Sequence, residues 1–534
     1  MGGGARVAGV NLTAAVVIVG TGPAGTSAAW PLVRAGLDVL LVEAGGPIDS
    51  PPPNRPTLAD VRGDRAGWSH LLGSQMEALR ASSGSSPKIR TSFPPGALDG
   101  YLQANRISAE GFTAVGLMAR GGLSNVWGAG ASAFDPLELS GWPITLDDLM
   151  PSYQDVCRRV GISGSQTDDL SGTHGHGLDL DPELTLGPLM ETLLERYGRR
   201  RSSLRIRVGR ARQAVLTRSR GTRGACALDN FCMWRCAKGS IYNAADEVAV
   251  LSQAPNVRLL EYTLVEAVEA GASGWRVRAQ DRRHGGSVEI AAGRVVLAAG
   301  VLPSTRLVLA ALDRYDAPVR LHSTPSFTSV FLDPSYLGRA LPQRGFGLGQ
   351  LTVTTTLDSD HSALGTLFLC DSVSAADLAV AMPFSRRGAI RIARDLASGL
   401  LVGLFYLPSS YSNNTTTLTR TRDGAGALHV SGGLRPDALA VMRSTIRSLS
   451  SDFRKLGFAR LPGSFKVHAA GSESHYGGTL PMGVATSTTG EVVGAPGLFV
   501  ADGAVLPSLP AKHHTFTVMA NADRIGRHLV ASGT

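Results

Sequence analysis

The feature that most constrains the fold is a unit near the N-terminus in which an apolar run leads into closely spaced glycines. Ala14 to Gly20 is a continuous run rich in β-branched residues, of the kind that is buried in a parallel sheet. The segment GTGPAG follows, with Gly20, Gly22 and Gly25 in GxGxxG spacing, and then a helical stretch and a second apolar strand that ends at Glu43. This order predicts the strand–turn–helix–strand unit of a Rossmann-like α/β domain.

The glycines and the acid of this unit have different physical tasks. Gly20 permits the tight turn, Gly22 lets a pyrophosphate approach the backbone, and Gly25 allows the helix to pack against the strand. Glu43 stands where a carboxylate accepts hydrogen bonds from the ribose hydroxyls of an adenosine. The sequence therefore predicts a dinucleotide site, and the unit alone does not distinguish NAD from FAD. We expect the site to include the neighbouring residues Pro23, Ala24 and Ala44.

Other glycine clusters do not repeat this unit. GFGLG at Gly345 to Gly349 and GAGAL at Gly424 to Leu428 neither follow an apolar strand nor open a helix. We therefore expect one dinucleotide site, with electrons that come from the substrate itself.

A second glycine motif lies in ARGGLSNVWGAGASAF, from Ala119 to Phe134. Two adjacent glycines, Gly121 and Gly122, leave the backbone bare, so a flat ring can lie against it. Ser124 and Asn125 offer hydrogen bonds to such a ring, and Trp127 follows them. The alternative for this segment taken alone is a flexible loop.

Together with GTGPAG and Glu43, this segment resembles the glucose–methanol–choline (GMC) oxidoreductases, a family of FAD-dependent alcohol oxidoreductases. Further matches are SGWPITLDDLMPSY, GRVVLAAGVLPSTRLVLAA and the closing block from His475 onward. Some members of the family bind FAD covalently through a histidine two residues after the serine of the second motif. Val126 occupies that position here, so the resemblance implies FAD that is held noncovalently.

The resemblance also implies a catalytic pair. In the family a histidine precedes a GT by three positions, which is His475 in SHYGGTLPMG. A second histidine or an asparagine lies at a fixed offset before the C-terminal helix, which is His513 in PAKHHTFTVMANADRIGRHLV, whereas His514 occupies a place where proline is common. An imidazole with a pKa of about 6.5 is well matched to accept the proton of an alcohol, while flavin N5 takes the hydride. We expect His475 to be the proton acceptor, His513 to orient the alcohol, and His514 to belong to the turn under the flavin.

The segment around this second histidine adds expectations about its surroundings. Thr515 is a candidate cap for the C-terminal helix, whose N-terminus would favour a reduced, anionic flavin and lower the pKa of a nearby histidine. A strand is expected from Gly497 to Ala501, and by resemblance Asp502 and Gly503 contact the flavin while Val265 contacts the adenine. The alternatives are surface histidines before a terminal helix and an aspartate that only caps a turn.

Three cysteines, Cys226, Cys232 and Cys236, lie close together in the sequence. Some sugar dehydrogenases of this family carry an iron–sulfur cluster on similarly spaced cysteines, and thiolates are the preferred ligands of such clusters. Since the chain shows no segment that would hand electrons to a haem partner, we favour loop cysteines and expect no metal site.

These motifs predict an α/β protein, α+β overall, with a Rossmann-like FAD-binding domain and an inserted, mostly antiparallel β-sheet domain for the substrate. We place the FAD-binding domain at residues 1–320 and 465–534, with lid or loop segments at about 47–110, and the substrate domain at 321–464. Alternating apolar and polar residues in GQLTVTTTLDSD, LGTLFLCDS, GLLVGLFYLPSS and NNTTTLTRT predict its half-buried strands.

Composition excludes several classes of partner. The net charge is +9, but the longest basic run, GRRRSS, has no interleaved aromatic residues on which bases would stack, so we expect no nucleic acid. No apolar stretch approaches the length of a membrane span, and five cysteines are too few for a disulfide framework, which favours a reducing cytoplasm.

The function expected from the sequence is the FAD-dependent oxidation of a small-molecule alcohol to a carbonyl, with oxygen or another carrier as the final electron acceptor. A sugar-like or polyol substrate is favoured, and a primary alcohol of an aminoglycoside in antibiotic biosynthesis stays open. The alternatives are a sugar dehydrogenase with an iron–sulfur cluster, an NAD(P)-dependent dehydrogenase and a flavin-binding protein without turnover.

Overall fold

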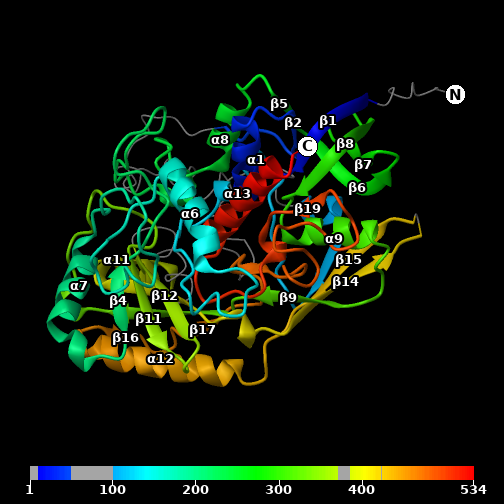
Figure 1. Cartoon of the computed structure of the whole chain (residues 1–534). Coiled ribbons are helices and arrows are strands. Elements are labelled where there is room, and N and C mark those ends of the chain that lie inside the picture. The colour runs from blue at the N-terminus through cyan, green and yellow to red at the C-terminus, as the bar shows by residue number, and fades with distance from the viewer. Residues whose placement is uncertain (1–9, 50–99, 371–384, 423, 534) are drawn as a thin grey trace.

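The computed structural model describes residues 10–49, 100–370, 385–422 and 424–533 of the chain (Figure 1). Most of the lid or loop segment expected at about residues 47–110 lies outside the described residues. Its described part includes a short helix, α5 (Tyr101–Ala104), and a strand, β3 (Ile107–Glu110). None of the described helices is long and apolar enough to cross a lipid bilayer.

The first sheet is built on strand β1 (Val10–Val19), which contains the apolar run that precedes the first glycine motif. Val16, Val17 and Ile18 are fully buried, as expected for a strand that is covered on both faces. Strand β1 pairs in parallel with β2 (Val39–Val42) and with β8 (Ser287–Leu297). Helix α1 (Pro23–Arg34) connects β1 to β2. The predicted strand–turn–helix–strand unit is therefore confirmed.

Four more strands complete this sheet, whose order is β5–β2–β1–β8–β7–β6, with β19 beside β8. Their bounds are β5 (Val257–Leu260), β6 (Thr263–Gly271), β7 (Gly274–Asp281) and β19 (Leu498–Val500). β5 and β19 extend the parallel part, whereas β6 and β7 form an antiparallel extension on β8. β19 lies within the strand expected from Gly497 to Ala501, so the C-terminal part of the chain joins the sheet that the N-terminal part begins.

Helices bring the two ends of the chain together on this sheet. Helix α13 (Thr515–Ala531) packs against α1, and Figure 1 shows α13 in red beside α1. Gly526 permits this close approach, because a Cβ atom there would lie 2.4 Å from the carbonyl oxygen of Ala28. The other helices around this sheet are α6 (Leu146–Val160) against α13, α8 (Ala244–Leu251) against α1, and α9 (Val301–Ala311) against β6.

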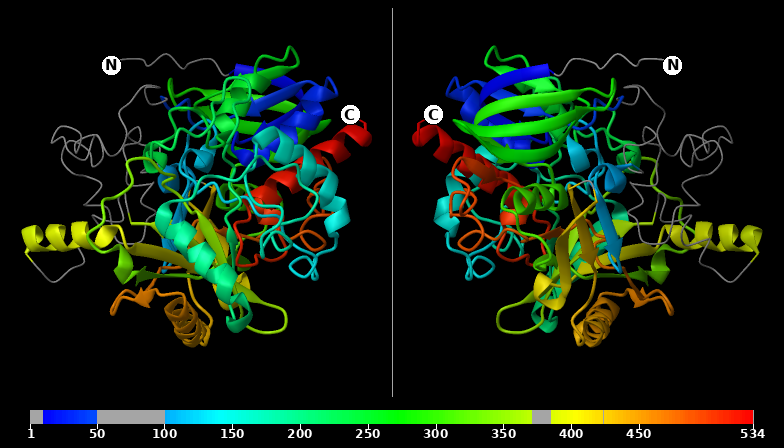
Figure 2. Two further views of the ribbon diagram at one scale, coloured as in Figure 1. Left: turned by 90° about the vertical axis from the view of Figure 1, so that its left-hand side faces the viewer. Right: turned by 90° about the vertical axis from the view of Figure 1, so that its right-hand side faces the viewer.

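The second sheet is antiparallel, in the order β16–β10–β13–β12–β11–β4, with β17 also paired to β10. Its strands are β4 (Arg207–Arg210), β10 (Ser326–Leu332), β11 (Leu351–Thr356), β12 (Ser362–Leu369), β13 (Leu400–Tyr406), β16 (Ala459–Arg460) and β17 (Lys466–Val467). A separate apolar core forms between this sheet and helices α7 (Pro188–Arg200) and α12 (Ala438–Lys455). The rings of Phe331 and Phe453 stack there at 4.3 Å. Figure 2 shows the first sheet at one end of the molecule and α12 at the other.

A third sheet lies between these parts in the order β18–β9–β14–β15–β3. Its remaining strands are β9 (Val319–Ser323), β14 (Asn414–Arg420), β15 (Gly426–Ser431) and β18 (Tyr476–Gly477). Because β18 follows directly after His475, this sheet fixes the backbone next to that residue.

The other described helices are short or lie outside these layers. They are α11 (Arg386–Ala397) and the 3-10 helices η2 (Gly122–Asn125), η3 (Arg201–Ser203), η4 (Cys232–Trp234), η5 (Pro334–Tyr336), η6 (Ser409–Tyr411) and η7 (Gly503–Val505).

The fold class expected from the sequence, an α/β domain with a mostly antiparallel sheet domain, is confirmed. The four polar–apolar stretches expected as strands are β11, β12, β13 and β14. Strand β4 joins the second sheet from an earlier part of the chain. The domain boundaries near residues 320 and 465 stay predictions.

Candidate active site

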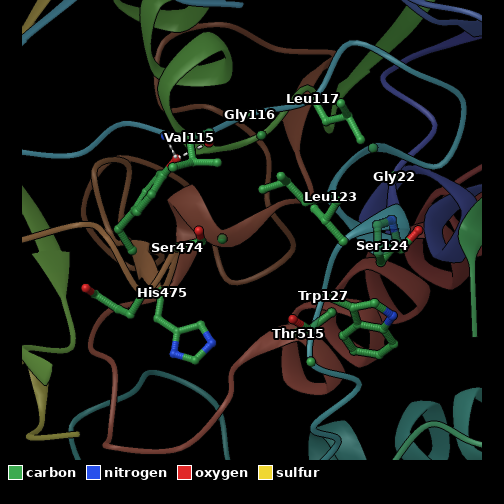
Figure 3. Close-up of a pocket in the computed structure, with 18 of the residues that line it drawn as sticks. Gly22, Val115, Gly116, Leu117, Leu123, Ser124, Trp127, Ser474, His475 and Thr515 are labelled. Atoms are coloured by element: carbon green, nitrogen blue, oxygen red, sulfur yellow. Dashed lines mark hydrogen bonds between the residues drawn. The ribbon is translucent and has the colours of Figure 1, made fainter. Parts of the chain in front are cut away.

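One large cavity, of about 910 Å³, runs between the first glycine motif and the C-terminal histidines. It is lined by residues of all three sheets and of the segments that precede α1 and α13. In Figure 3, Gly22 and Ser124 lie on one side of this cavity and His475 on the other, with Leu123 between them. The sequence motifs expected to hold a dinucleotide and to perform chemistry therefore share one space.

The first glycine motif forms the end of the cavity beside β1. Gly20 has a φ of +98°, and a Cβ atom there would lie 2.4 Å from the carbonyl oxygen of Ala298. A Cβ atom on Gly22 would meet no atom within 4 Å, because this residue faces the cavity at the N-terminus of α1. No side chain caps α1, so its first amide groups are available to an anion such as a diphosphate.

Gly25, the third glycine of the motif, has a packing role. A Cβ atom there would lie 2.0 Å from the carbonyl oxygen of Gly20, and the residue is buried within α1. Gly25 does not line the cavity, whereas Pro23 and Ala24 do.

Glu43 lies at the end of β2, where it lines the cavity together with Ala44. Its carboxylate accepts hydrogen bonds from the backbone and hydroxyl of Thr21, at 3.1 and 2.6 Å, and from the backbone of Gly45 at 3.0 Å. Burial raises the pKa of Glu43 above its ordinary value, and these three hydrogen bonds act in the opposite direction. The carboxylate is thus held in one orientation and keeps further lone pairs for a ribose.

The second glycine motif lies beside the first, on the same side of the cavity. Gly122 has a φ of +51°, and a Cβ atom there would lie 3.5 Å from Cα of Gly22. Gly121, with a φ of +84°, lies against Asn243 and Ala245 instead and does not line the cavity. The two glycine motifs therefore approach each other with bare backbone on both sides.

Polar side chains of this motif are tied to the protein. Ser124 donates to the carbonyl of Gly121 and accepts from the backbone of Ala244. Asn125 donates to the carbonyls of Arg120 and Gly122. Asn243, which caps α8, bonds to the side chains of both Ser124 and Asn125. Ser124, Val126 and Trp127 line the cavity, whereas Asn125 does not.

Asp502 and Gly503 line the cavity at the end of β19, and Val265 lines it from β6. Asp502 is buried and accepts hydrogen bonds from Ser304, Gly300 and Ala504. Burial raises its pKa. The aspartate caps η7 and also connects this turn to α9. Asp502 therefore stabilises the protein itself, whether or not a ligand is bound.

Three histidines meet at the other end of the cavity: His475, and the adjacent pair His513 and His514. The ring centroid of His475 lies 5.1 Å from that of His513 and 5.4 Å from that of His514. His475 and His513 are half-buried because they face the cavity, whereas His514 is buried. Within the described part of the chain, Nδ1 of His475 is buried without a partner, which leaves Nε2 as the ring nitrogen that faces the cavity.

All three imidazoles have lowered pKa values. The pKa of His475 is well below its ordinary value, first because of burial and then because of His513 and His514. Burial lowers the pKa of His513 and of His514 to about 4. Burial is the first cause for each of them, and the lowering expected from the C-terminal helix stays a prediction. The rings are therefore neutral near pH 7 and able to accept a proton.

Helix α13 begins at Thr515, which lines the cavity, and His514 is its N-cap residue without a side-chain cap hydrogen bond. The expectation that Thr515 caps the helix is therefore wrong by one position. Thr515 is the first residue of the helix. Its hydroxyl is therefore not placed to accept hydrogen bonds from the free amides of the first turn, as an N-cap side chain does.

Two neighbours fix the position of His513. The ring of Tyr406, on β13, lies 5.7 Å from the ring of His513 and 5.2 Å from that of His475. A Cβ atom on Gly130 would lie 2.6 Å from Nδ1 of His513, so the imidazole packs directly against backbone there.

Lys512, next to His513, anchors the same turn and was not expected from the sequence. Its side chain is 2% exposed. Its ammonium binds Glu138 at 2.5 Å and Asp135 at 3.2 Å, and it donates to the carbonyls of Ala133 and Thr173. Burial raises the pKa of Glu138 to about 7, against the opposing effect of Lys512.

The sequence interpretation also missed most of the cavity wall around the histidines. Glu473, Ser474, Tyr406, Tyr476 and the segment 115–118 all line it. Glu473 and Ser474 directly precede His475, which was a usable signal. Segment 115–118 has no periodicity or motif that would have marked it.

The three clustered cysteines pack next to the wall of this cavity, in a cluster that includes the lining residue Trp127. They belong to a small apolar cluster with Phe346 and Leu348, and none of them lines the cavity. Across the described ranges, no group of three His, Cys, Asp or Glu side chains is arranged to hold a metal ion.

Comparisons with known proteins agree with this architecture. A family model described as GMC oxidoreductase matches residues 410–522. The 6'''-hydroxyparomomycin C oxidase of Streptomyces lividus is 28% identical over 312 residues, which cover 55% of this chain and 49% of that protein. The match thus spans about half the length of this curated relative.

A solved structure, the pyridoxine 4-oxidase from Mesorbium loti, aligns with 98% of this chain and 100% of its own, with a TM-score of 0.61 and 17% identity. This alignment supports the fold, and the family match covers the segment that carries His475 and His513. The C-terminal part of the chain is thus similar to the GMC oxidoreductases, and the chain as a whole has the fold of this solved oxidase.

Proposed function

We propose that this protein binds FAD noncovalently and oxidises an alcohol to a carbonyl compound. The observation that carries the proposal is the position of two neutral imidazoles, His475 and His513, 5.1 Å apart at one end of a cavity whose other end is a GxGxxG turn. FAD, when bound, supplies the acceptor for the hydride that leaves the alcohol carbon.

The residues present fit this cofactor. Gly22 faces open space at an uncapped helix N-terminus, where a diphosphate finds unpaired amide groups. Glu43 is held at the position of a ribose-binding acid. The cavity of about 910 Å³ leaves room for a cofactor together with a substrate. Val126 stands where a covalent attachment would need a histidine, which favours noncovalent binding.

Each histidine has a separate task in this proposal. His475 accepts the hydroxyl proton at Nε2, the nitrogen that faces the cavity, as the C–H bond breaks. His513 holds the alcohol oxygen so that its proton points to His475. Tyr406 contacts both rings and holds them in fixed positions relative to each other. The neutral state of the imidazoles near pH 7 supports these roles.

The substrate proposed is a sugar-like primary alcohol. The support is the relative from Streptomyces lividus, which is named for the oxidation of a hydroxylated paromomycin. Because the match covers about half of that protein, the choice of an amino sugar for this chain is our proposal.

The test is a spectrum followed by an anaerobic screen. Purified protein should be yellow, should release FAD on heating, and should bleach when mixed without oxygen with a primary alcohol that it oxidises. An NAD(P)-dependent dehydrogenase would instead be colourless and would need added nicotinamide cofactor. A yellow protein that no alcohol bleaches would indicate flavin binding without turnover.

A further inference from the structure

One face of the second sheet forms a wall of the cavity. Side chains of a strand alternate between the two faces of its sheet. On β10, Phe327 and Phe331 belong to the core that the sheet shares with α7 and α12, whereas Thr328 and Val330 line the cavity. The cavity residues of β12 and β13 lie beside them, so the strand register arranges this wall in rows.

The first row, nearest the histidines, is polar. Ser326 of β10 pairs with Tyr406 of β13, and both line the cavity. The ring of Tyr406 lies 5.2 Å from that of His475 and 5.7 Å from that of His513. The reacting hydroxyl of the proposed substrate therefore belongs beside this first row.

The third row is apolar. Val330 pairs with Val402, and Val402 pairs on its other side with Phe368 of β12. These three side chains line the cavity, are partly exposed, and lie outside the two large apolar cores described above. Val402 and Tyr406 are four residues apart on one strand, so the first and third rows lie about 14 Å apart. Water against this apolar patch is unfavourable, and an apolar group of a ligand would displace it.

A polar edge runs beside these rows. Lys466 of β17 pairs with Thr328 in the second row, and the ring of His468 shares a hydrogen bond with the hydroxyl of Thr328. All three residues line the cavity. Burial, and then the charge of Lys466, lowers the pKa of His468 to about 4, so this imidazole is neutral near pH 7. The second row and its edge thus offer hydrogen-bonding partners to the hydroxyl groups of a sugar ring.

We propose that Val330, Val402 and Phe368 bind an apolar group that the sugar-like substrate carries on the side away from its reacting hydroxyl, so that the enzyme prefers alkyl or aryl glycosides to unsubstituted sugars. This inference rests on the proposed alcohol oxidation and adds a second determinant of its substrate. The sugar ring lies between the first and third rows, beside the polar edge. The choice of an amino sugar concerns the ring that is oxidised, whereas this subsite concerns the group attached to that ring.

The experiment compares two glucosides on the flavin-loaded enzyme. Methyl and hexyl β-D-glucoside present the same hydroxyl groups, including the same primary alcohol, and only the hexyl chain extends beyond the ring toward the third row. Anaerobic flavin reduction gives kcat and KM for each. Because burial of one methylene strengthens binding by about fourfold, we expect kcat/KM to be about tenfold or more higher for hexyl glucoside. The gain should lie in KM, since the chain is bound equally before and during the reaction.

Variants separate this patch from the rest of the sheet. The double variant Val330→Thr/Val402→Thr keeps the branched shape of both side chains and makes the patch polar. It should reduce the preference for hexyl glucoside to about threefold or less and leave the kinetics with methyl glucoside unchanged. The matched control is Val467→Thr on β17 of the same sheet. Val467 packs against the second core and does not line the cavity, so the preference should stay as in wild type.

Two further measurements test what occupies the patch. If FAD or another part of the chain covered Val330 and Val402, the double variant would bind FAD more weakly or unfold more easily. We expect FAD titration and denaturant unfolding of the double variant to match wild type, because a partly exposed side chain tolerates a hydroxyl. A clear loss of FAD affinity or of stability would overturn the assignment of the patch to the substrate.

Three kinetic results would also contradict the inference and leave alcohol oxidation standing. They are equal kcat/KM for the two glucosides, a preference that survives in the double variant, and a higher kcat/KM for an alcohol without an apolar group, such as paromomycin, than for hexyl glucoside. If no alcohol of any kind bleaches the flavin, the proposed function fails first and this inference fails with it.

Discussion

Gly22 and Gly25 are less than one helical turn apart, yet the structure gives them opposite surroundings. A Cβ atom on Gly22 meets nothing within 4 Å, and its φ of −68° suits any residue. A Cβ atom on Gly25 lies 2.0 Å from the carbonyl oxygen of Gly20. We therefore predict that Gly22→Ala leaves the apoprotein as stable as wild type and weakens FAD binding, because the methyl group occupies the cofactor's approach to the backbone.

Gly25→Ala serves as the contrasting variant. It should destabilise the apoprotein, since the helix must move away from the strand. Thermal unfolding of apoproteins and FAD titration measure the two effects. Equal FAD affinity in Gly22→Ala and wild type would contradict the assignment of this turn to the cofactor.

The low pKa of His475 predicts how the rate depends on pH. A neutral alcohol is the suitable substrate, because it does not itself ionise in the pH range of the measurement. Since the pKa of His475 is well below 6.5, the imidazole stays unprotonated from about pH 6 to 8, and kcat/KM should be level over this range. The rate should fall only at lower pH, where the proton acceptor becomes charged. Stopped-flow flavin reduction measures the profile, and an acid midpoint near 6.5 would contradict it.

Replacing His475 by Ala should lower the rate of flavin reduction by about 10²- to 10⁴-fold and leave the flavin spectrum unchanged. A wild-type rate of flavin reduction in this variant would show that another group accepts the hydroxyl proton.

At the scale of elements, the turn between β19 and α13 depends on an ion pair that lies outside the cavity. Lys512 is buried against Glu138 and Asp135, which belong to the segment after the second glycine motif. Lys512→Met removes the charge and leaves Glu138 buried without its partner, which should destabilise the protein by about 3–5 kcal/mol. The turn that carries His513 should also loosen, so kcat should fall more than KM changes.

The double variant Lys512→Met/Glu138→Gln tests this explanation. It removes the second buried charge and should recover part of the stability lost by Lys512→Met alone. Denaturant unfolding gives the free energies. If the single variant is as stable as wild type, the ion pair does not hold the turn.

Elements that follow local rules could be predicted from the sequence, and contacts between distant elements could not. The apolar run of β1, the glycine spacing and Glu43 lie within one short stretch, so their geometry follows from local chain chemistry. His475 and His513 were paired by family resemblance, and β18 and α13 bring them to 5.1 Å. Tyr406 reaches the same place from a strand of the second sheet, and the partners of Lys512 lie more than 300 residues earlier in the chain. Such pairings depend on how sheets and helices assemble, and no local pattern encodes them.

At the scale of the whole molecule, the cavity proposed for the cofactor lies between the first apolar core and the face of the second sheet that points away from its own core. One core surrounds the first sheet and the C-terminal helix, and the other lies between the second sheet and α12. The cavity takes its lining from both sides, including Gly22 and Glu43 from the first and Val402, Leu404 and Tyr406 from strand β13 of the second. A ligand that fills this space contacts both parts and adds its binding energy to their association.

This arrangement predicts how FAD changes unfolding. Without FAD, the two cores should unfold in separate calorimetric transitions, because the cavity between them is filled only by solvent. At a free FAD concentration of 100 times Kd, the gain in stability is about 2.7 kcal/mol, and the transitions should move to higher temperature and merge. Differential scanning calorimetry of apoprotein and FAD-loaded protein measures this, with Gly22→Ala as the control that keeps the apoprotein profile and loses the shift. If the apoprotein shows a single transition whose temperature FAD does not change, the cofactor does not connect the two cores.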